Sequence, residues 1–118
     1  MSYDIYLKEP VSGTTVLFDS PHQIKGGTYC VGGTNEAWLN ITWNYSKFYY
    51  AAFGTEGIRT IYGMSGAESI TVLENAIAKL GNDESNDYWE ATEGNAKKAL
   101  LQLLSMAKMR PDAIWEGD

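Results

Sequence analysis

The fold is decided by residues 34–54, which read TNEAWLNITWNYSKFYYAAFG. Over residues 39–45 apolar and polar side chains alternate, and this alternation would suit a β-strand. A helix accounts for a longer stretch, because the apolar and aromatic residues then share one face at helical intervals. We therefore expect a helix over about 36–53, with Thr34 or Asn35 as the cap at its start and Gly54 just past its end.

This expected helix is rich in aromatic side chains. Only a narrow polar stripe would lie outside its apolar arc, so the helix should be covered on more than one side. A domain as small as 118 residues does not easily bury so many aromatic rings in one core. The pattern therefore predicts at least a homodimer, with an interface that contains Trp38, Trp43, Phe48 and Tyr50.

Upstream of this stretch the composition is typical of strands and turns. Residues 3–8 alternate apolar and polar side chains, residues 14–18 are rich in β-branched types, and a Pro-Val-Ser-Gly turn separates the two runs. The two runs predict a hairpin, and residues 28–31, which lie between paired glycines, predict one further short strand. The strands would thus fall within about 3–31.

Downstream, two further helices are expected. Ser65 and Glu68 have the spacing of a capping box at the start of a helix over about 66–80. A second periodic apolar pattern predicts a helix over about 93–109. The whole chain, 1–118, is expected to form one α+β domain, in which a small N-terminal antiparallel sheet (a hairpin plus a short strand) packs against three helices.

The composition excludes several classes of function. Fifteen acidic against nine basic residues give a formal net charge of -6, which leaves no basic surface for direct binding of nucleic acid. Cys30 and His22 are the single cysteine and the single histidine, so a structural zinc site lacks ligands. The first residues lack a secretory pattern, and no run approaches twenty apolar residues. We expect a cytosolic protein without metal or cofactor, located away from membranes.

The first candidate site is the turn Gly32-Gly33-Thr34, which would bind an anionic ligand. Glycines let backbone N–H groups approach an anion, and the N-terminus of the expected helix would favour negative charge. Arg59 and Arg110 are the only arginines, and both lie near aromatic residues where they could clamp a phosphate or carboxylate. Turn glycines, a helix cap and ordinary ion pairs are the simpler interpretation of the same residues.

The second candidate site is the acidic loop (residues 82–90) between the last two expected helices. Its spacing fails the EF-hand pattern, because Tyr88 stands where glycine is required and no glutamate occupies the twelfth position. Carboxylates beside an aromatic anchor would instead suit a partner protein with a basic surface. The residues expected to contact such a partner are Asp83, Glu84, Asp87, Trp89 and Glu90.

Several short motifs are spread over nearly the whole chain. They are GGTY at 26–29, GGT at 32–34, AWLNIT at 37–42, GIR at 57–59, IYGM at 61–64, DYWE at 87–90, TEGNAK at 92–97 and MRPD at 109–112. Together they resemble a family of small, functionally uncharacterised proteins of bacteriophages and prophages. The resemblance implies a phage-encoded accessory protein, located in the cytoplasm of a bacterial host, that binds and blocks host machinery. It implies no catalytic residue.

These observations favour a non-enzymatic phage or prophage accessory protein that acts by protein–protein interaction. Its expected role is to inhibit a host defence or nucleic-acid-handling complex. The alternative is a protein that binds or sequesters an anionic small molecule or nucleotide through the first candidate site. An enzyme is least favoured, because no complete nucleophile, metal or acid–base motif occurs in the sequence.

Overall fold

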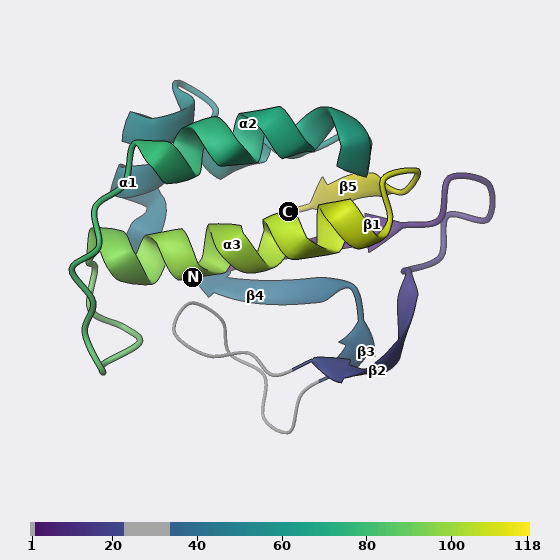
Figure 1. Cartoon of the computed structure of the whole chain (residues 1–118), viewed down its shortest axis with the longest axis horizontal. Coiled ribbons are helices and arrows are strands. Elements are labelled where there is room, and N and C mark those ends of the chain that lie inside the picture. The colour runs from purple at the N-terminus through teal and green to yellow at the C-terminus, as the bar shows by residue number, and fades with distance from the viewer. Residues whose placement is uncertain (1, 23–33) are drawn as a thin grey trace.

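The computed structural model describes residues 2–22 and 34–118, with the backbone alone at 20–22. Within these ranges the chain forms an α+β fold, as the sequence predicts (Figure 1). The elements in chain order are β1 (Ser2–Lys8), β2 (Leu17–His22), β3 (Thr34–Glu36), β4 (Trp38–Thr42), the short 3-10 helix η1 (Trp43–Tyr45), α1 (Ser46–Phe53), the 3-10 helix η2 (Gly57–Ile61), α2 (Gly66–Ala78), α3 (Glu93–Met109) and β5 (Ile114–Gly117).

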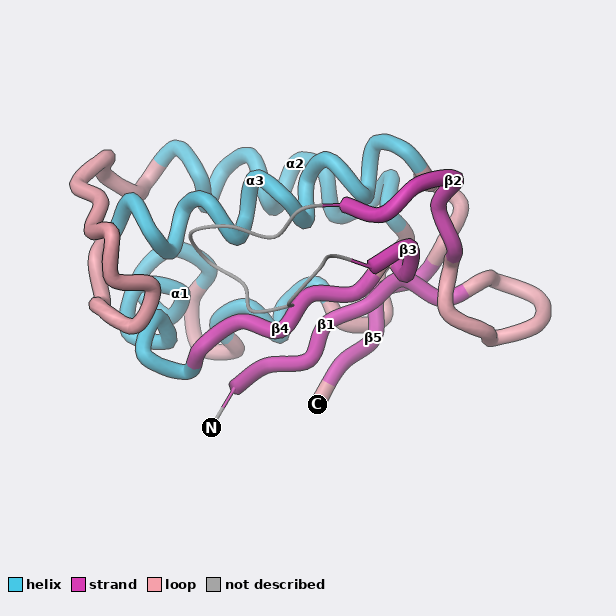
Figure 2. The backbone as a smooth tube through the Cα atoms, turned by 90° about the horizontal axis from the view of Figure 1, so that it is seen from below, coloured by secondary structure: helices cyan, strands magenta, loops and turns pink. Residues whose placement is uncertain are grey.

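The main sheet has three antiparallel strands in the order β4-β1-β5. Along β1, Tyr3, Ile5 and Leu7 are buried, whereas the residues between them are half-buried and face the other side. The α-helices lie on one side of this sheet, and no described helix covers the opposite face (Figure 2). The second sheet is the pair β2 and β3.

The expected helix over 36–53 is wrong in its first half, where the strand reading is correct. β4 pairs with β1, which places Leu39 opposite Ile5 and Ile41 opposite Tyr3. Both residues are fully buried on the helix side of the sheet. The α-helix begins only at Ser46, because pairing with β1 buries the alternating side chains as a strand.

The ends of the expected helix also differ from the sequence prediction. Thr34 and Asn35 both lie in β3, so neither caps a helix. Thr42 instead starts the helical segment, since its side chain accepts a hydrogen bond from the Asn44 N–H at 3.2 Å. Gly54 does follow the last turn, with a φ of 109° that favours glycine.

The expected N-terminal hairpin forms, but over a short length. Residues 3–8 form the strand β1, which meets the following segment antiparallel at the bridge between Lys8 and Thr15. On either side of this bridge the Val16 N–H donates to the Leu7 backbone oxygen at 2.9 Å and the Glu9 N–H donates to the Thr14 backbone oxygen at 2.7 Å. The neighbours of β1 are β4 and β5, and β2 pairs with β3. The expected strand at 28–31 lies outside the described residues. The C-terminal strand β5 has no counterpart in the sequence prediction.

The two downstream helices are confirmed. The hydroxyl of Ser65 accepts a hydrogen bond from the Glu68 N–H, and the Glu68 carboxylate accepts one from the Ser65 N–H, so the capping box is complete. Thr92 caps α3 by accepting from the Asn95 N–H at 3.1 Å. The two helices lie side by side over the main sheet (Figure 1). None of the described helices combines the length and apolar character needed to cross a membrane.

Candidate functional site

The acidic loop is folded around one buried side chain, Asn95 in the first turn of α3. The Asn95 amide donates to the backbone oxygens of Asp87 and Glu90, both at 3.2 Å. Its side-chain oxygen accepts from the Ser85 N–H at 3.2 Å. Asn95 is fully buried, so it satisfies three backbone groups of the loop away from water. The loop therefore has a fixed conformation over its middle and its end.

The acidic loop is also fastened to η1 at the end of β4. The backbone oxygen of Tyr88 accepts a hydrogen bond from the Tyr45 hydroxyl, and the Tyr88 hydroxyl accepts one from the Thr42 N–H at 2.7 Å. The Asn44 side chain donates to the backbone oxygen of Trp89 at 2.8 Å. These three bonds join segments more than forty residues apart in the sequence. They hold the backbone of Tyr88 and Trp89 against the body of the domain.

Gly94 allows α3 to approach the start of the acidic loop. Its N–H donates to the backbone oxygen of Asp83 at 2.9 Å. A Cβ atom at this position would lie 2.6 Å from that oxygen and 2.7 Å from Cγ of Glu84. A glycine is therefore required where the loop packs on the helix.

A series of tyrosine ring contacts connects the acidic loop to the core, from the half-buried Tyr88 through Tyr45 and Tyr49 to Tyr3. Burial raises the pKa of Tyr88 to about 12 and that of Tyr3 to about 12. Burial likewise raises the pKa of Tyr45 and Tyr49 above the ordinary value. The hydroxyl of Tyr49 donates to the backbone oxygen of Ala96 at 3.0 Å. All these hydroxyls are therefore neutral in the folded protein at neutral pH.

We expect the free energy of unfolding to fall as the pH rises from about 10 to about 12. A tyrosine with a raised pKa in the folded state ionises first in the unfolded chain, so its contribution is complete below pH 10 and is lost above it. Each such tyrosine makes the free energy of unfolding fall by up to about 1.4 kcal/mol per pH unit in this range. Denaturant titrations at pH 8 to 12 measure the slope. Tyrosinate absorbance that reaches its full value near pH 10, with the circular dichroism unchanged, would contradict the prediction.

The predicted partner-binding residues all lie on this fixed loop, but several of their carboxylates also serve the loop itself. Asp87 accepts from the Trp89 N–H at 3.0 Å, and Glu90 accepts from the Ser85 hydroxyl at 2.6 Å. Glu84 forms an ion pair with Lys98 at 2.9 Å. Within the described part of the chain, Glu84 is the loop carboxylate that pairs with a cation, so the loop keeps most of its negative charge.

Trp89 is the large aromatic residue of the acidic loop that reaches solvent. Its side chain is 54% exposed, and its ring lies edge-on against Tyr88 with 4.7 Å between centroids. An exposed indole on a fixed backbone loses little conformational freedom when a partner binds it. The loop thus presents an aromatic anchor surrounded by carboxylates, as the sequence predicts for a partner site.

The residues of the predicted anion site are not brought together in the described part of the chain. Arg59 lies over the rings of Tyr3 and Trp43, with 5.3 and 5.2 Å from its guanidinium carbon to the ring centroids. Its Nε donates to the backbone oxygen of Asp118 at 2.9 Å. Arg59 thus joins β1, η1 and the end of the described chain.

Arg110 has a different set of partners. It forms ion pairs with Glu9 and with Asp112, the second at 2.9 Å. This guanidinium lowers the pKa of both carboxylates. The two arginines share no partner, Thr34 lies in β3, and Gly32 and Gly33 fall outside the described residues. Arg110 therefore fits the simpler interpretation of the sequence, in which the arginine forms ordinary ion pairs and binds no anionic ligand.

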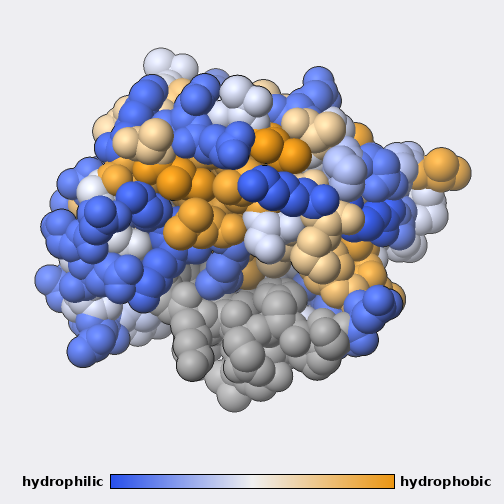
Figure 3. Space-filling model, viewed as in Figure 1, coloured by the Kyte–Doolittle hydropathy of each residue, from blue (hydrophilic) through white to orange (hydrophobic). Residues whose placement is uncertain are grey.

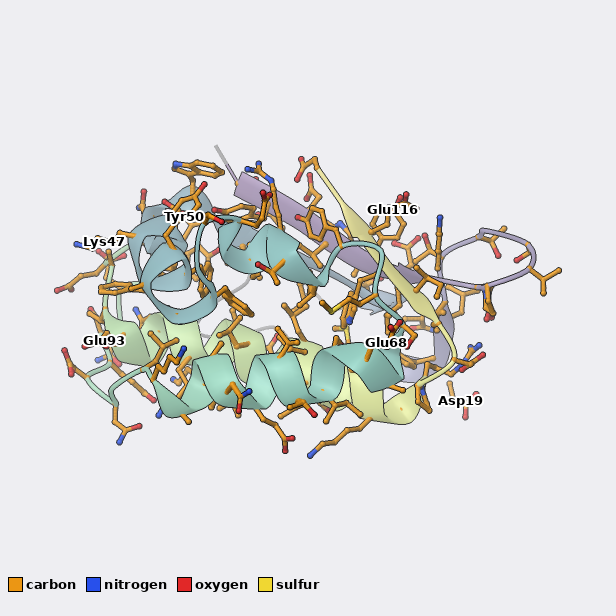
Figure 4. The ribbon with its side chains drawn as sticks, turned by 90° about the horizontal axis from the view of Figure 1, so that it is seen from above. Asp19, Lys47, Tyr50, Glu68, Glu93 and Glu116 are labelled. Atoms are coloured by element: carbon orange, nitrogen blue, oxygen red, sulfur yellow. The ribbon has the colours of Figure 1, made fainter. Side chains whose placement is uncertain are left out.

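The aromatic residues of the predicted dimer interface lie on three different elements. Trp43 on η1 stacks on Tyr3 with 4.8 Å between centroids, and Phe48 on α1 packs partly buried against the core. Trp38 is on β4, and Tyr50 on α1 is the most exposed of the four at 41% (Figure 4). The single aromatic helix from which the dimer was inferred is therefore absent, and the dimer stays a prediction.

The helix side of the molecule carries other apolar residues. A band of apolar surface runs along α3 and its seam with α2 (Figure 3). On α3, Leu101 and Met109 are large apolar residues that are 46% and 59% exposed. The sequence analysis assigned neither residue to a surface.

A pocket that the sequence analysis missed lies on the open face of the main sheet. It has a volume of about 430 Å³ and is lined by Asp4, Tyr6, Thr15, Glu36 and Trp38. The alternation in residues 3–8 places Asp4 and Tyr6 on one side of a strand, which was a usable signal. Trp38 lies beside Tyr6 only because β4 is a strand that pairs with β1. The pocket could not be predicted while residues 38–42 were expected to form a helix.

The described residues, 2–22 and 34–118, contain no group of three or more His, Cys, Asp or Glu side chains that could hold a metal ion. No family model matches the chain, and the comparisons with curated proteins and with solved structures gave no match. The resemblance to phage and prophage proteins therefore stays a prediction from the sequence motifs.

Proposed function

We propose that this chain is a non-enzymatic interaction protein that binds a basic surface of a partner protein through the acidic loop. The observation that carries the proposal is Trp89, an exposed indole held on a fixed loop among carboxylates. Tryptophan is among the residue types that contribute most to binding when a partner covers them. The acidic loop supplies both the anchor and the charge that such an interface uses.

The rigidity of the loop supports this function. Asn44 and Tyr45 of η1 and Asn95 of α3 fix its backbone through hydrogen bonds. A loop that is ordered before binding avoids part of the entropy cost of association. Affinity then depends on what Trp89 and its neighbours contact, which makes single substitutions informative.

The charge of the loop supports a basic partner. The whole sequence has a formal net charge of -6, and the loop carboxylates of Asp83, Asp87 and Glu90 contribute to it. A concentrated negative surface accelerates association with a positive one and makes the rate depend on salt. Together with the motif resemblance, this supports a phage or prophage accessory protein that inhibits a host defence or nucleic-acid-handling complex. The separate partners of Arg59 and Arg110 give no support to an anionic small-molecule site.

We expect Trp89→Ala to weaken binding of the partner by about 30-fold, which corresponds to about 2 kcal/mol. The partner would first be isolated by affinity capture from a lysate of the bacterial host, with the wild-type protein and the variant as parallel baits. Proteins retained by the wild type alone at 50 mM salt and released by 300 mM salt would be purified. Titration calorimetry of each purified pair then gives the affinity.

Two further variants separate the anchor from the charge and from the loop conformation. Asp87→Asn with Glu90→Gln keeps the hydrogen-bond acceptors and removes two charges, so association should slow and lose part of its salt dependence. Gly94→Ala keeps Trp89 and every carboxylate but collides with Asp83, so it should weaken binding by displacing the loop. Met109→Ala, on exposed α3 surface, is the matched control. A partner that binds Trp89→Ala as tightly as the wild type would overturn the proposal.

A further inference from the structure

The pocket on the open sheet face lies where the two sheets meet. Asp4 and Tyr6 of β1 and Trp38 of β4 form its floor, and Tyr6 and Trp38 are direct neighbours across the two strands. Glu36, the last residue of β3 in the second sheet, and Thr15, which bridges to Lys8, also line the pocket. Its volume of about 430 Å³ is at the small end of the range for ligand pockets. The space suits one long side chain with its adjoining backbone.

The lining of the pocket favours a cation. Among the described residues that line it, two are carboxylates and none is a lysine or arginine. The nearby Lys8 of β1 is engaged, because its ammonium forms an ion pair with Glu116 at 2.9 Å. Glu116 lies on β5 on the side of the sheet away from α2 and α3 (Figure 4). An anionic ligand would be repelled, and an apolar one would leave the carboxylates without water.

Asp4 has acceptor capacity beyond its bonds within the chain. One carboxylate oxygen accepts from the Asn40 side chain at 2.8 Å. A carboxylate has about four acceptor positions on its two oxygens, so further donors can bind to it. The bond from Asn40 also fixes the rotamer of Asp4, which prepares the carboxylate for a ligand.

The aromatic residues favour a planar cation. Tyr6 and Trp38 are both half-buried, so each ring has part of its surface in contact with solvent. A guanidinium group stacks on aromatic faces and binds carboxylates with two parallel hydrogen bonds. An ammonium group has neither the flat shape nor the paired donors. The combination of two rings and two carboxylates therefore matches arginine better than lysine.

We propose that this pocket binds an arginine side chain from an extended basic segment of a second protein. The guanidinium lies against Tyr6 and Trp38 and donates to Asp4 and Glu36, while the flanking peptide runs over the open face of the sheet. A partner segment fits better than a free cation, because the pocket opens onto a sheet face that no described helix covers (Figure 2). The site is distinct from the acidic loop and does not depend on the function proposed for Trp89.

The test uses the blocked peptide acetyl-Ser-Gly-Arg-Gly-Ser-amide and the full-length protein labelled with nitrogen-15. Backbone and indole N–H signals are followed during the titration. We expect saturable shifts at Tyr6 and at the Trp38 indole. The citrulline peptide, which has the same shape without the charge, should bind at least about tenfold more weakly, and the lysine peptide should bind with intermediate strength.

Matched variants decide whether the pocket is responsible. Asp4→Asn with Glu36→Gln removes the two charges but keeps oxygen acceptors, including the one that Asn40 uses, and should weaken binding at least about tenfold. Trp89→Ala should bind the arginine peptide as the wild type does, so failure of the loop proposal leaves this one intact. Equal binding of the arginine and citrulline peptides, shifts confined to the acidic loop, or undiminished binding to the double variant would each overturn the proposal.

Discussion

Replacing Trp115 with alanine is expected to lower the free energy of unfolding by about 3–5 kcal/mol. Trp115 is fully buried on β5, opposite Leu7 of the central strand. Its indole N–H donates to the hydroxyl of Ser69 in α2 at 2.8 Å, and Ser69 is also fully buried. The indole therefore joins the main sheet to the helix layer. Its removal would leave a large cavity and break a buried hydrogen bond.

Urea unfolding followed by circular dichroism measures the effect of Trp115→Ala. Trp89→Ala is the matched control, because it deletes the same side chain from an exposed position and should change the stability by about 0.5 kcal/mol or less. Trp115→Phe keeps most of the side-chain volume but loses the indole N–H, so its loss in free energy of unfolding should lie between those of Trp115→Ala and Trp89→Ala. A loss below about 1 kcal/mol for Trp115→Ala would mean that β5 does not pack on α2 as described.

Gly66→Ala is expected to destabilise the protein by about 3 kcal/mol. Gly66 is the first residue of α2, where alanine would normally stabilise a helix. Here a Cβ atom would lie 2.5 Å from the backbone oxygen of Arg110, 2.9 Å from that of Ala107 and 3.0 Å from Cα of Pro111. All three contacts are backbone atoms at the end of α3, so no side-chain rotation relieves them. The start of α2 would have to move away from α3.

Gly81→Ala provides the matched control for Gly66→Ala. A Cβ atom at Gly81 would lie 3.4 Å from the flexible carboxylate of Glu93, so the change should cost little. Thermal and urea unfolding of the two variants, measured side by side, separates steric collision from the general effect of replacing glycine. Equal stability of the two variants would contradict the close approach of α2 and α3.

Local sequence signals predicted the elements that depend on nearby residues. The capping box of Ser65 and Glu68 predicts the start of α2, the apolar periodicity predicts α3, and both helices begin where these signals place them. The alternation in residues 3–8 likewise predicts β1. The acidic loop could be named as a candidate partner site for the same reason, because its carboxylates and its tryptophan follow one another in the sequence and need no tertiary contact to be recognised.

The elements that depend on distant residues were missed or assigned wrongly. Leu39 and Ile41 fit a strand and a helix equally well, and pairing with Ile5 and Tyr3 decides for the strand. The strand β5 that contains Trp115 has only four residues, which is too short for a recognisable alternation of apolar and polar side chains. Pairing with Leu7 nevertheless places Trp115 in the core. Both pairings join positions far apart in the chain, and no local propensity encodes such contacts.

The sequence by itself determined that this is a small acidic α+β chain with two downstream helices, the first with a capping box, and an acidic loop that contains a tryptophan. Hydrophobic periodicity and capping are local, so they act wherever the chain has the right residues. The tertiary structure alone decided the partners of β1, the separation of Arg59 from Arg110 and the meeting of Asp4, Tyr6, Glu36 and Trp38 in one pocket. Those results follow from burying apolar residues of distant segments in one core, which fixes the register of the strands and therefore which side chains meet on the open face.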